Sequence, residues 1–173
     1  VIFSPSPEDA TRVAALKSGQ VDAIWPLPSD LIAAVQQDSH LTVQRDPSIY
    51  LYYMAMNTQH KPLADVRVRQ AINYAIDRNL WLKVAFAGLG KPATSAMPEG
   101  VQFYQKQTDP DYHYAPDKAK ALLKAAGYPQ GLDLKLWVTN ATAAVRAGQV
   151  LKAQLAAVGI RATVTPMDSG TRN

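Results

Sequence analysis

The sequence contains no cysteine, and this absence excludes several kinds of chemistry together. A chain without thiols forms no disulfide, holds no thiolate-bound metal and has no cysteine nucleophile. Long apolar runs are missing as well, because no stretch approaches the roughly 18 consecutive apolar residues of a membrane-spanning helix. The start shows neither an initiator methionine nor the basic and then apolar pattern of a signal peptide, so we expect an internal piece of a longer protein. With 47% hydrophobic residues among 173, the chain as given is expected to be soluble and globular.

Basic clusters and catalytic motifs are scarce. The net charge is +4, but lysines and arginines are dispersed, which argues against nucleic-acid binding. His40, His60 and His113 lie far apart without paired spacing, so we predict no metal site and no cofactor. The segment 88–91 (GLGK) lacks the earlier glycine and the following Ser or Thr of a phosphate-binding loop, and no G-x-S-x-G elbow occurs. An α/β enzyme and an isolated interaction domain remain alternatives from other functional classes.

Short apolar stretches alternate with amphipathic helical patterns, which is typical of an α/β fold. In the first third, we expect strands at 1–4, 21–25 and 41–45 and helices from Ser6 to Gly19 and from Ser29 to Val35. The stretch 48–57 is apolar on both faces, so it predicts a central strand covered on both sides.

The stretch 57–88 predicts two packed helices. Asp65 is placed to cap the first, Asp77 and Asn79 the second, and Gly88 is expected to end the pair in a left-handed conformation. Charged residues flank these helix ends, and we expect them to cap and pair rather than to bind a ligand. They are Asp65, Arg67, Arg69, Asp77 and Arg78.

The second half predicts a loop, a helix and a crossover. The stretch 88–107 is too rich in glycine and proline for regular structure and is either a binding loop or a connector. A helix begins at Pro116, preceded by Ala115, which supplies no side-chain cap. A strand at 132–139, a helix at 144–158 and a strand at 160–166 form a crossover, so the two strands are expected to be parallel and connected with right-handed sense.

Several short sequence motifs, which follow one another in a fixed order, resemble those of one family. The run PLADVRVRQAINYAIDR, preceded by YLYYMAMN and followed by KAKALLKAAGYP, resembles the hallmark of the family 5 solute-binding proteins of ABC importers, which carry peptides, oligopeptides or nickel. The resemblance extends from PEDATRVAALKSGQVDA to GIRATVTPMD, essentially the whole chain. The blocks KVAFAGLGKPATSAMP, YAPDKAKALLKAAGYPQG and AQLAAVGIRATVTPMDSGTR are most similar to the glutathione-binding branch.

This resemblance implies a fold and an organisation. The fold would be α/β, periplasmic-binding-protein-like (type II) and partial, with mixed sheets and flanking helices. Residues 1–47 would end the first lobe, and residues 48–173 would form the first half of the second, ligand-closing lobe. The chain would then lack the export signal, most of the first lobe and the rest of the second.

The resemblance also implies a function. The protein would be the extracytoplasmic substrate-binding component of an ABC importer, which captures a small peptide, with glutathione expected, by lobe closure. It would act as a monomer without catalysis and deliver the ligand to a permease pair driven by cytoplasmic ATPases. It would lie in the periplasm, or be membrane-associated outside the cytoplasm in a Gram-positive organism. A dipeptide or oligopeptide carrier is the alternative within the family, and the scarce histidine disfavours a nickel carrier.

Two aromatic residues are the foremost candidates for ligand contact. Trp25 ends an expected strand, where α/β sheets open onto their crevice, although a core position is the alternative. In the resembled family an aromatic at this point lines the pocket. Tyr53 matches a ligand-facing tyrosine of oligopeptide-binding members, while Tyr50 and Tyr52 point to the opposite face and are expected in the core. Ala55 stands where those members carry a glutamate, so the pocket is expected to differ in shape.

Three further residues complete the predicted ligand set. Trp137 lies on the polar face of its strand, Asn140 follows just beyond that strand, and Asn57 ends the crossover strand. The family's groups that bind a peptide's amino terminus would lie beyond Asn173.

Overall fold

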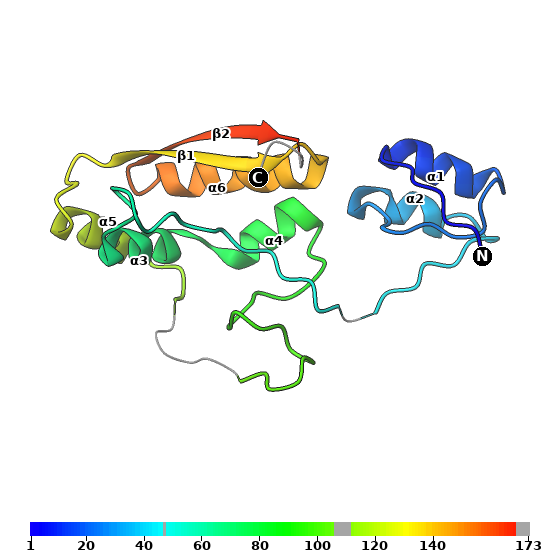
Figure 1. Ribbon diagram of the computed structural model, residues 1–173, viewed down its shortest axis with the longest axis horizontal. Coiled ribbons are helices and arrows are strands. Elements are labelled where there is room, and N and C mark those ends of the chain that lie inside the picture. The colour runs from blue at the N-terminus through cyan, green and yellow to red at the C-terminus, as the bar shows by residue number, and fades with distance from the viewer. Residues whose placement is uncertain (47, 106–111, 169–173) are drawn as a thin grey trace. The chain divides into compact units, whose positions relative to one another are not determined.

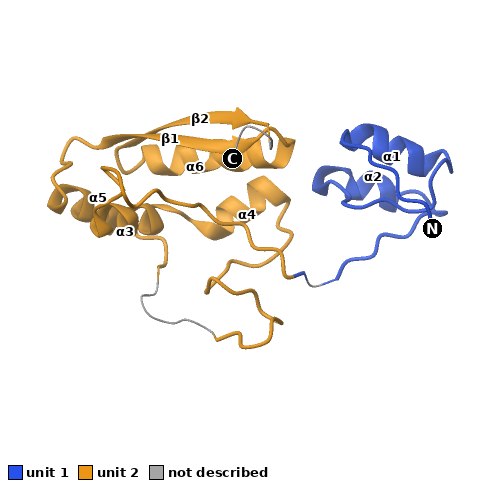
Figure 2. Ribbon diagram, viewed as in Figure 1, with its two compact units in different colours: residues 1–48 blue, residues 49–173 orange. Residues whose placement is uncertain are grey.

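The computed structural model describes residues 1–46, 48–105 and 112–168, and the structural statements below concern these residues. The chain divides into two compact units, Val1–Ser48 and Ile49–Asn173 (Figure 2), and each is considered by itself. The assignment of residues 1–47 and 48–173 to two lobes stays a prediction.

The first unit is built around two short helices. Helix α1 spans Asp9–Lys17, and a 3₁₀ turn, η1 (Ser29–Leu31), leads into α2 (Ile32–Gln36) (Figure 1). Both helices were expected, but each begins differently: the N-cap of α1 is Glu8, and Ser29 lies inside η1 instead of capping it. Val13 and Val35 are the buried apolar residues described in this unit.

The strands expected before residue 58 are wrong as strands. No ladder forms at 1–4, 21–25, 41–45 or 48–57 within the described part of the chain. A strand exists only when its backbone groups pair with a neighbour, and an apolar pattern alone supplies no neighbour. Tyr50 is 72% exposed, so the stretch 48–57 is also not a central strand covered on both faces.

The second unit contains four helices and one parallel sheet in its described residues. The helices are α3 (Val66–Ala75), α4 (Arg78–Phe86), α5 (Pro116–Ala125) and α6 (Thr142–Ala156). The strands β1 (Leu132–Thr139) and β2 (Ile160–Met167) pair in parallel, from Leu132 opposite Ile160 to Thr139 opposite Met167. The predicted parallel crossover through α6 is therefore confirmed, whereas the expected mixed character of the sheet is absent from this described pair.

The helices cover one face of the sheet in layers. Helix α6 packs on both strands, α4 packs on α6, and α3 packs on α5 (Figure 1). The periodic apolar face of α3 is buried as predicted, and Val68 and Ile72 are at most 1% exposed. Burying one such side chain contributes about 1.5–3 kcal/mol, so this face is a main source of the unit's stability.

Helix α5 begins without a side-chain cap, as predicted from Ala115. Pro116 occupies the start of the helix, where its missing N–H costs nothing. The Ala115 N–H donates instead to the Tyr74 carbonyl at 2.8 Å. The start of α5 is thereby tied to the end of α3.

Candidate functional site

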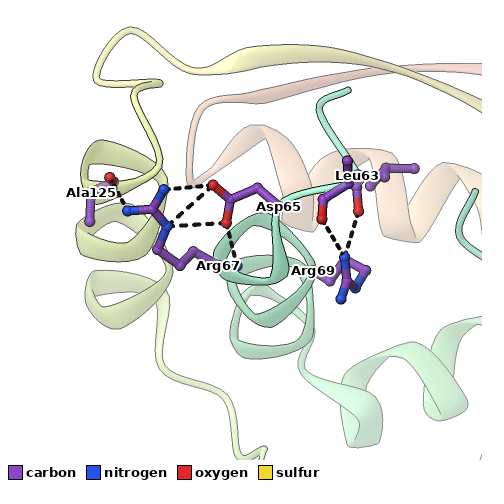
Figure 3. A network of polar contacts seen from close by, with 6 residues as sticks. Leu63, Asp65, Arg67, Arg69 and Ala125 are labelled. Carbon is purple, nitrogen blue, oxygen red and sulfur yellow. Dashed lines mark hydrogen bonds and ion pairs between the residues drawn. The ribbon is translucent and has the colours of Figure 1, made fainter. Parts of the chain in front are cut away.

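The charged residues at the start of α3 form a structural network (Figure 3). The Asp65 carboxylate caps α3 by accepting from the Arg67 N–H at 2.8 Å, and it pairs with the Arg67 guanidinium at 2.7 Å. Hydrogen bonds from the Arg67 side chain and backbone lower the pKa of Asp65 to about 2. Arg67 Nη1 also donates to the Ala125 carbonyl at 2.6 Å, which satisfies an orphan acceptor at the end of α5.

Arg69 also has a structural role, because it binds the backbone next to α3. Its Nη1 donates to the carbonyls of Leu63 and Ala64 at 2.8 and 3.0 Å, which fixes the turn before α3 (Figure 3). Both acceptors belong to the backbone of the turn just before α3, so these bonds are local and structural.

The start of α4 repeats this pattern. Asp77 Oδ1 accepts from the backbone N–H groups of Asn79 and Leu80, both at 3.0 Å, so Asp77 is the cap and Asn79 is not. Arg78 Nη1 donates to the Tyr112 carbonyl at 2.6 Å. The predicted capping by Asp65 and Asp77 and the pairing of Asp65 with Arg67 are confirmed. Arg69 and Arg78 donate to backbone carbonyls, and none of these charged residues is assigned to a ligand.

The end of α4 differs by one residue from the prediction. Ala87, with φ of 53°, already adopts the left-handed conformation expected to begin at Gly88. The helix therefore ends one residue earlier than glycine placement indicates.

The segment 49–57 presents two different faces. Tyr52 packs against Phe86 of α4, with ring centroids 4.6 Å apart, whereas Tyr53 is 78% exposed. The predicted divergence of these two tyrosines is present, but Tyr52 is still 57% exposed, so the expectation that Tyr50 and Tyr52 belong to the core is wrong. The reason is that an alternating pattern sets direction, while the partner segments set burial. Asn57 accepts from the Gln59 N–H through its side chain at 3.0 Å and thus shapes a turn.

Trp137 and Asn140 lie at the carboxyl end of β1. Val138 faces Gly148 of α6, so the alternating Trp137 side chain points to the opposite face, where it is 62% exposed beside Thr165 of β2. Asn140 donates from its backbone to the Met167 carbonyl at 3.2 Å, and its side-chain amide donates to the Asp168 carboxylate. The structure thus brings Trp137 and Asn140 to one end of the sheet.

Trp25 belongs to the first unit and is 84% exposed, so the core alternative for this residue is wrong. Arg12 holds the adjoining turn, because its Nη2 and Nε donate to the Pro26 carbonyl at 3.0 and 3.2 Å. The indole is therefore presented on a supported turn.

The predicted ligand set does not include every exposed aromatic residue, and Phe103 is one outside it. Phe103, 82% exposed, has a φ of 69° and lies in the Gly-Pro loop, which is irregular to residue 105 as predicted, residues 106–107 falling outside the described part. The sequence signal was a pair of adjacent aromatic residues, Phe103 and Tyr104, in a loop rich in glycine and proline. The left-handed backbone of Phe103 could not be read from residue type, because phenylalanine rarely adopts it.

A groove with a volume of about 460 Å³ lies beside α5 and the turn between α6 and β2. Its lining includes Lys120, Lys124 and Tyr128, and none of the five predicted ligand residues. The described residues contain no group of three potential metal ligands, and none of their helices combines the length and apolar content of a membrane crossing.

Comparisons with known proteins place the chain in a family. The model of the bacterial extracellular solute-binding proteins, family 5 (middle part), matches residues 1–173. This chain belongs to that family. Family 5 comprises solute-binding proteins of ABC importers and not enzymes, and its members act outside the cytoplasm.

Individual relatives agree with this membership. The glutathione-binding protein GsiB of Shigella flexneri serotype 5b is 38% identical over 99% of this chain and 34% of its own length. The chain therefore spans about a third of the curated relatives it matches. The ABC transporter-associated periplasmic binding protein DppA of Helicobacter pylori, solved with the peptide STSA, is 27% identical with a TM-score of 0.88 over 96% of this chain and 32% of that one.

A third comparison concerns the fold alone. The dipeptide-binding protein of Pseudoalteromonas sp. SM9913, solved with Met-Leu, shares 24% identity and a TM-score of 0.86 over 96% of this chain and 34% of that chain. The predicted α/β class and the likeness to type II periplasmic binding proteins are confirmed.

Proposed function

We propose that this chain is part of an extracytoplasmic carrier that captures a small peptide, glutathione, and delivers it to an ABC permease pair with cytoplasmic ATPases. The observation that carries the proposal is the 38% identity to glutathione-binding relatives over 99% of the chain. In this proposal, residues 1–47 end the first lobe and residues 48–173 begin the second, and the lobes close around the ligand. The protein works as a monomer in the periplasm.

The proposed ligand contacts are Trp25, Tyr53, Asn57, Trp137 and Asn140. The exposure of the three aromatic rings supports them, because rings left open to solvent offer large apolar surfaces that a peptide's side chains and backbone can cover. The amides of Asn57 and Asn140 can donate to carbonyl groups and accept from N–H groups, which suits peptide bonds.

The decisive test is calorimetric titration of the full-length protein with reduced glutathione, Met-Leu, a tetrapeptide and a nickel–histidine complex. We expect saturable binding of glutathione at one site per protein and no heat from the nickel complex. Heat from Met-Leu or the tetrapeptide alone would replace glutathione with the dipeptide or oligopeptide alternative. No heat from any peptide would refute the carrier proposal.

Two variants test the proposed contacts. Replacing Tyr53→Ala or Trp137→Ala should raise the Kd for the bound peptide about three- to tenfold, because an aromatic contact contributes roughly 0.5–1.5 kcal/mol beyond area burial. Tyr114→Ala is the matched control, because Tyr114 is an exposed aromatic residue outside the candidate set. An equal loss in this control would show that the effect is not specific to the site.

A further inference from the structure

An aromatic cluster fastens the start of the second unit to helix α4. The Tyr52 ring lies 4.6 Å from that of Phe86 and 6.4 Å from that of Trp81, and the latter two rings are 5.1 Å apart. Tyr50 adds a fourth ring, 5.7 Å from Tyr52. These centroid separations fall in the range of favourable tilted and edge-to-face aromatic pairs.

Helix α4, on which the Tyr52 ring packs, is itself held in place by α6. Trp81 donates from Nε1 to the Ala147 carbonyl of α6 at 3.2 Å, and Gln154 of α6 donates to the Asp77 carbonyl at the start of α4 at 3.1 Å. Helix α4 is thus bonded to α6 at two points. A ring that packs on α4 is held against a rigid part of the unit.

Side chains attach the segment that carries Tyr52 to the rest of the unit. Among the described residues, no backbone hydrogen bond holds 51–57 to another segment. Tyr52 packs on α4, and Met54 and Met56 pack at the edge of the core. Burial, with the Tyr50 phenol nearby, raises the pKa of Tyr52, which agrees with a ring lying against α4.

The attachment decides where Tyr53 points. In extended backbone, consecutive side chains leave on opposite sides, so a Tyr52 ring seated on α4 directs Tyr53 away from it. Tyr53 is correspondingly 78% exposed, against 57% for Tyr52. Losing the Tyr52 ring would let the segment rotate, and Tyr53 would have to be ordered again when a ligand binds.

We propose that Tyr52, seated on Phe86 and Trp81, is a positioning residue that holds Tyr53 in its ligand-contacting orientation. This inference rests on the proposed peptide-binding function. Tyr52 itself touches no ligand in this scheme. Its ring and not its hydroxyl does the positioning, because the contacts to α4 are ring contacts.

A double-mutant cycle in the full-length protein tests this dependence, with reduced glutathione as the probe. Tyr52→Ala should raise the Kd about two- to fivefold, and by no more than Tyr53→Ala does, because the conformational entropy of Tyr53 is then lost on binding. Tyr52→Phe should restore the Kd to within twofold of the wild-type value. The double variant Tyr52→Ala/Tyr53→Ala should bind no more weakly than Tyr53→Ala alone, since a residue that acts only through Tyr53 has no effect without it.

Leu122→Ala is the matched control. Leu122 is partly buried against the same core from α5, so its truncation destabilises the unit while the ring contacts of Tyr52 with Trp81 and Phe86 stay in place. It should lower the Tm as much as Tyr52→Ala does, or more, and leave the Kd unchanged. Multiplicative losses in the double variant, or an equal Kd loss in Leu122→Ala, would overturn the positioning role.

A readout without ligand separates this inference from the proposed function. This chain has no cysteine, so after replacement of any cysteine elsewhere in the full-length protein by serine, a nitroxide can be attached through Tyr53→Cys and its mobility measured by electron paramagnetic resonance. We expect the label to become more mobile with Tyr52→Ala and to stay restricted with Tyr52→Phe. Unchanged mobility in Tyr52→Ala would overturn the anchor. A freed label in a protein that binds no peptide would refute the proposed function while the anchor stands.

Discussion

Asp65 and Arg67 show that the most recognisable residues of a chain can be structural. Asp65 caps α3, the two side chains form an ion pair, and Arg67 also donates to the last turn of α5 (Figure 3). Their hydrogen-bonding groups are therefore occupied by the backbone and by each other. By contrast, the candidate ligand residues Tyr53 and Trp137 keep their rings exposed. At the scale of single residues, recognisability and availability for binding are separate properties.

The Asp65–Arg67 pair predicts a pH dependence of stability. The folded pKa of Asp65, about 2, lies below its ordinary value of 3.8, so the carboxylate stabilises the fold above pH 3.8 and this contribution is lost as pH falls through 2. Asp65→Asn keeps a good N-cap but removes the charge. It should therefore lower the Tm by a few degrees at pH 7, with a difference from wild type that narrows between pH 4 and pH 2.

Thermal melts followed by circular dichroism across pH 2–7 measure this difference. Arg67→Gln removes the other partner and should show the same narrowing. A difference in Tm that persists undiminished at pH 2 would contradict the assigned role of the charge.

At the scale of elements, the junction of β1 and β2 depends on two glycines in contact. Gly131 has a φ of +80°, and a Cβ added there would lie 1.9 Å from the Gly159 carbonyl oxygen. Both residues just precede their strands, and the Leu132 N–H donates to the same Gly159 carbonyl at 3.2 Å. The close approach lets the parallel register begin at this point.

Gly131→Ala should lower the free energy of unfolding by about 3 kcal/mol or more, because it adds a backbone overlap to an unfavourable left-handed conformation. Gly127→Ala is the matched control, since Gly127 has a φ of +91° with open space around it, and it should cost only about 1–2 kcal/mol. Urea denaturation measures both values. Equal costs would show that the contact with Gly159 relaxes freely.

At the scale of the molecule, the two units differ in their capacity to fold alone. In the described residues, Val1–Ser48 buries two apolar residues, Val13 and Val35, whereas Ile49–Asn173 contains a continuous core. Chains below roughly 60 residues are marginal even with a good core. The second unit is therefore expected to fold stably without the first.

Expressing the two units separately tests this expectation. Residues 49–173 should show a cooperative thermal transition by circular dichroism, and residues 1–48 should show the spectrum of an unfolded chain. A cooperative transition in 1–48, or none in 49–173, would contradict the placement of the core. The full chain serves as the reference for both transitions.

The elements that the sequence alone predicted correctly are those with local signals. Asp65 and Asp77 caps, the amphipathic face of α3 and the β1–α6–β2 crossover all follow from residue types at short spacing. The family membership was predicted in the same way, from short sequence motifs in a fixed order along the chain. The five ligand residues, by contrast, stay predictions, because ligand contact depends on which segments approach one another.

What only the tertiary structure decided is pairing and exposure. The alternation in 48–57 predicted a covered strand, yet it could not supply the neighbour that a strand requires, and the segment instead rests on α4 through Tyr52. The left-handed backbone conformations of Ala87 and Phe103 could likewise not be predicted from the conformational preferences of these residue types. The sequence by itself determined the family, the helices and the parallel crossover, because these depend on local chemistry. The tertiary structure decided which side chains meet and which stay exposed, because burial is set by contacts between segments distant in the chain.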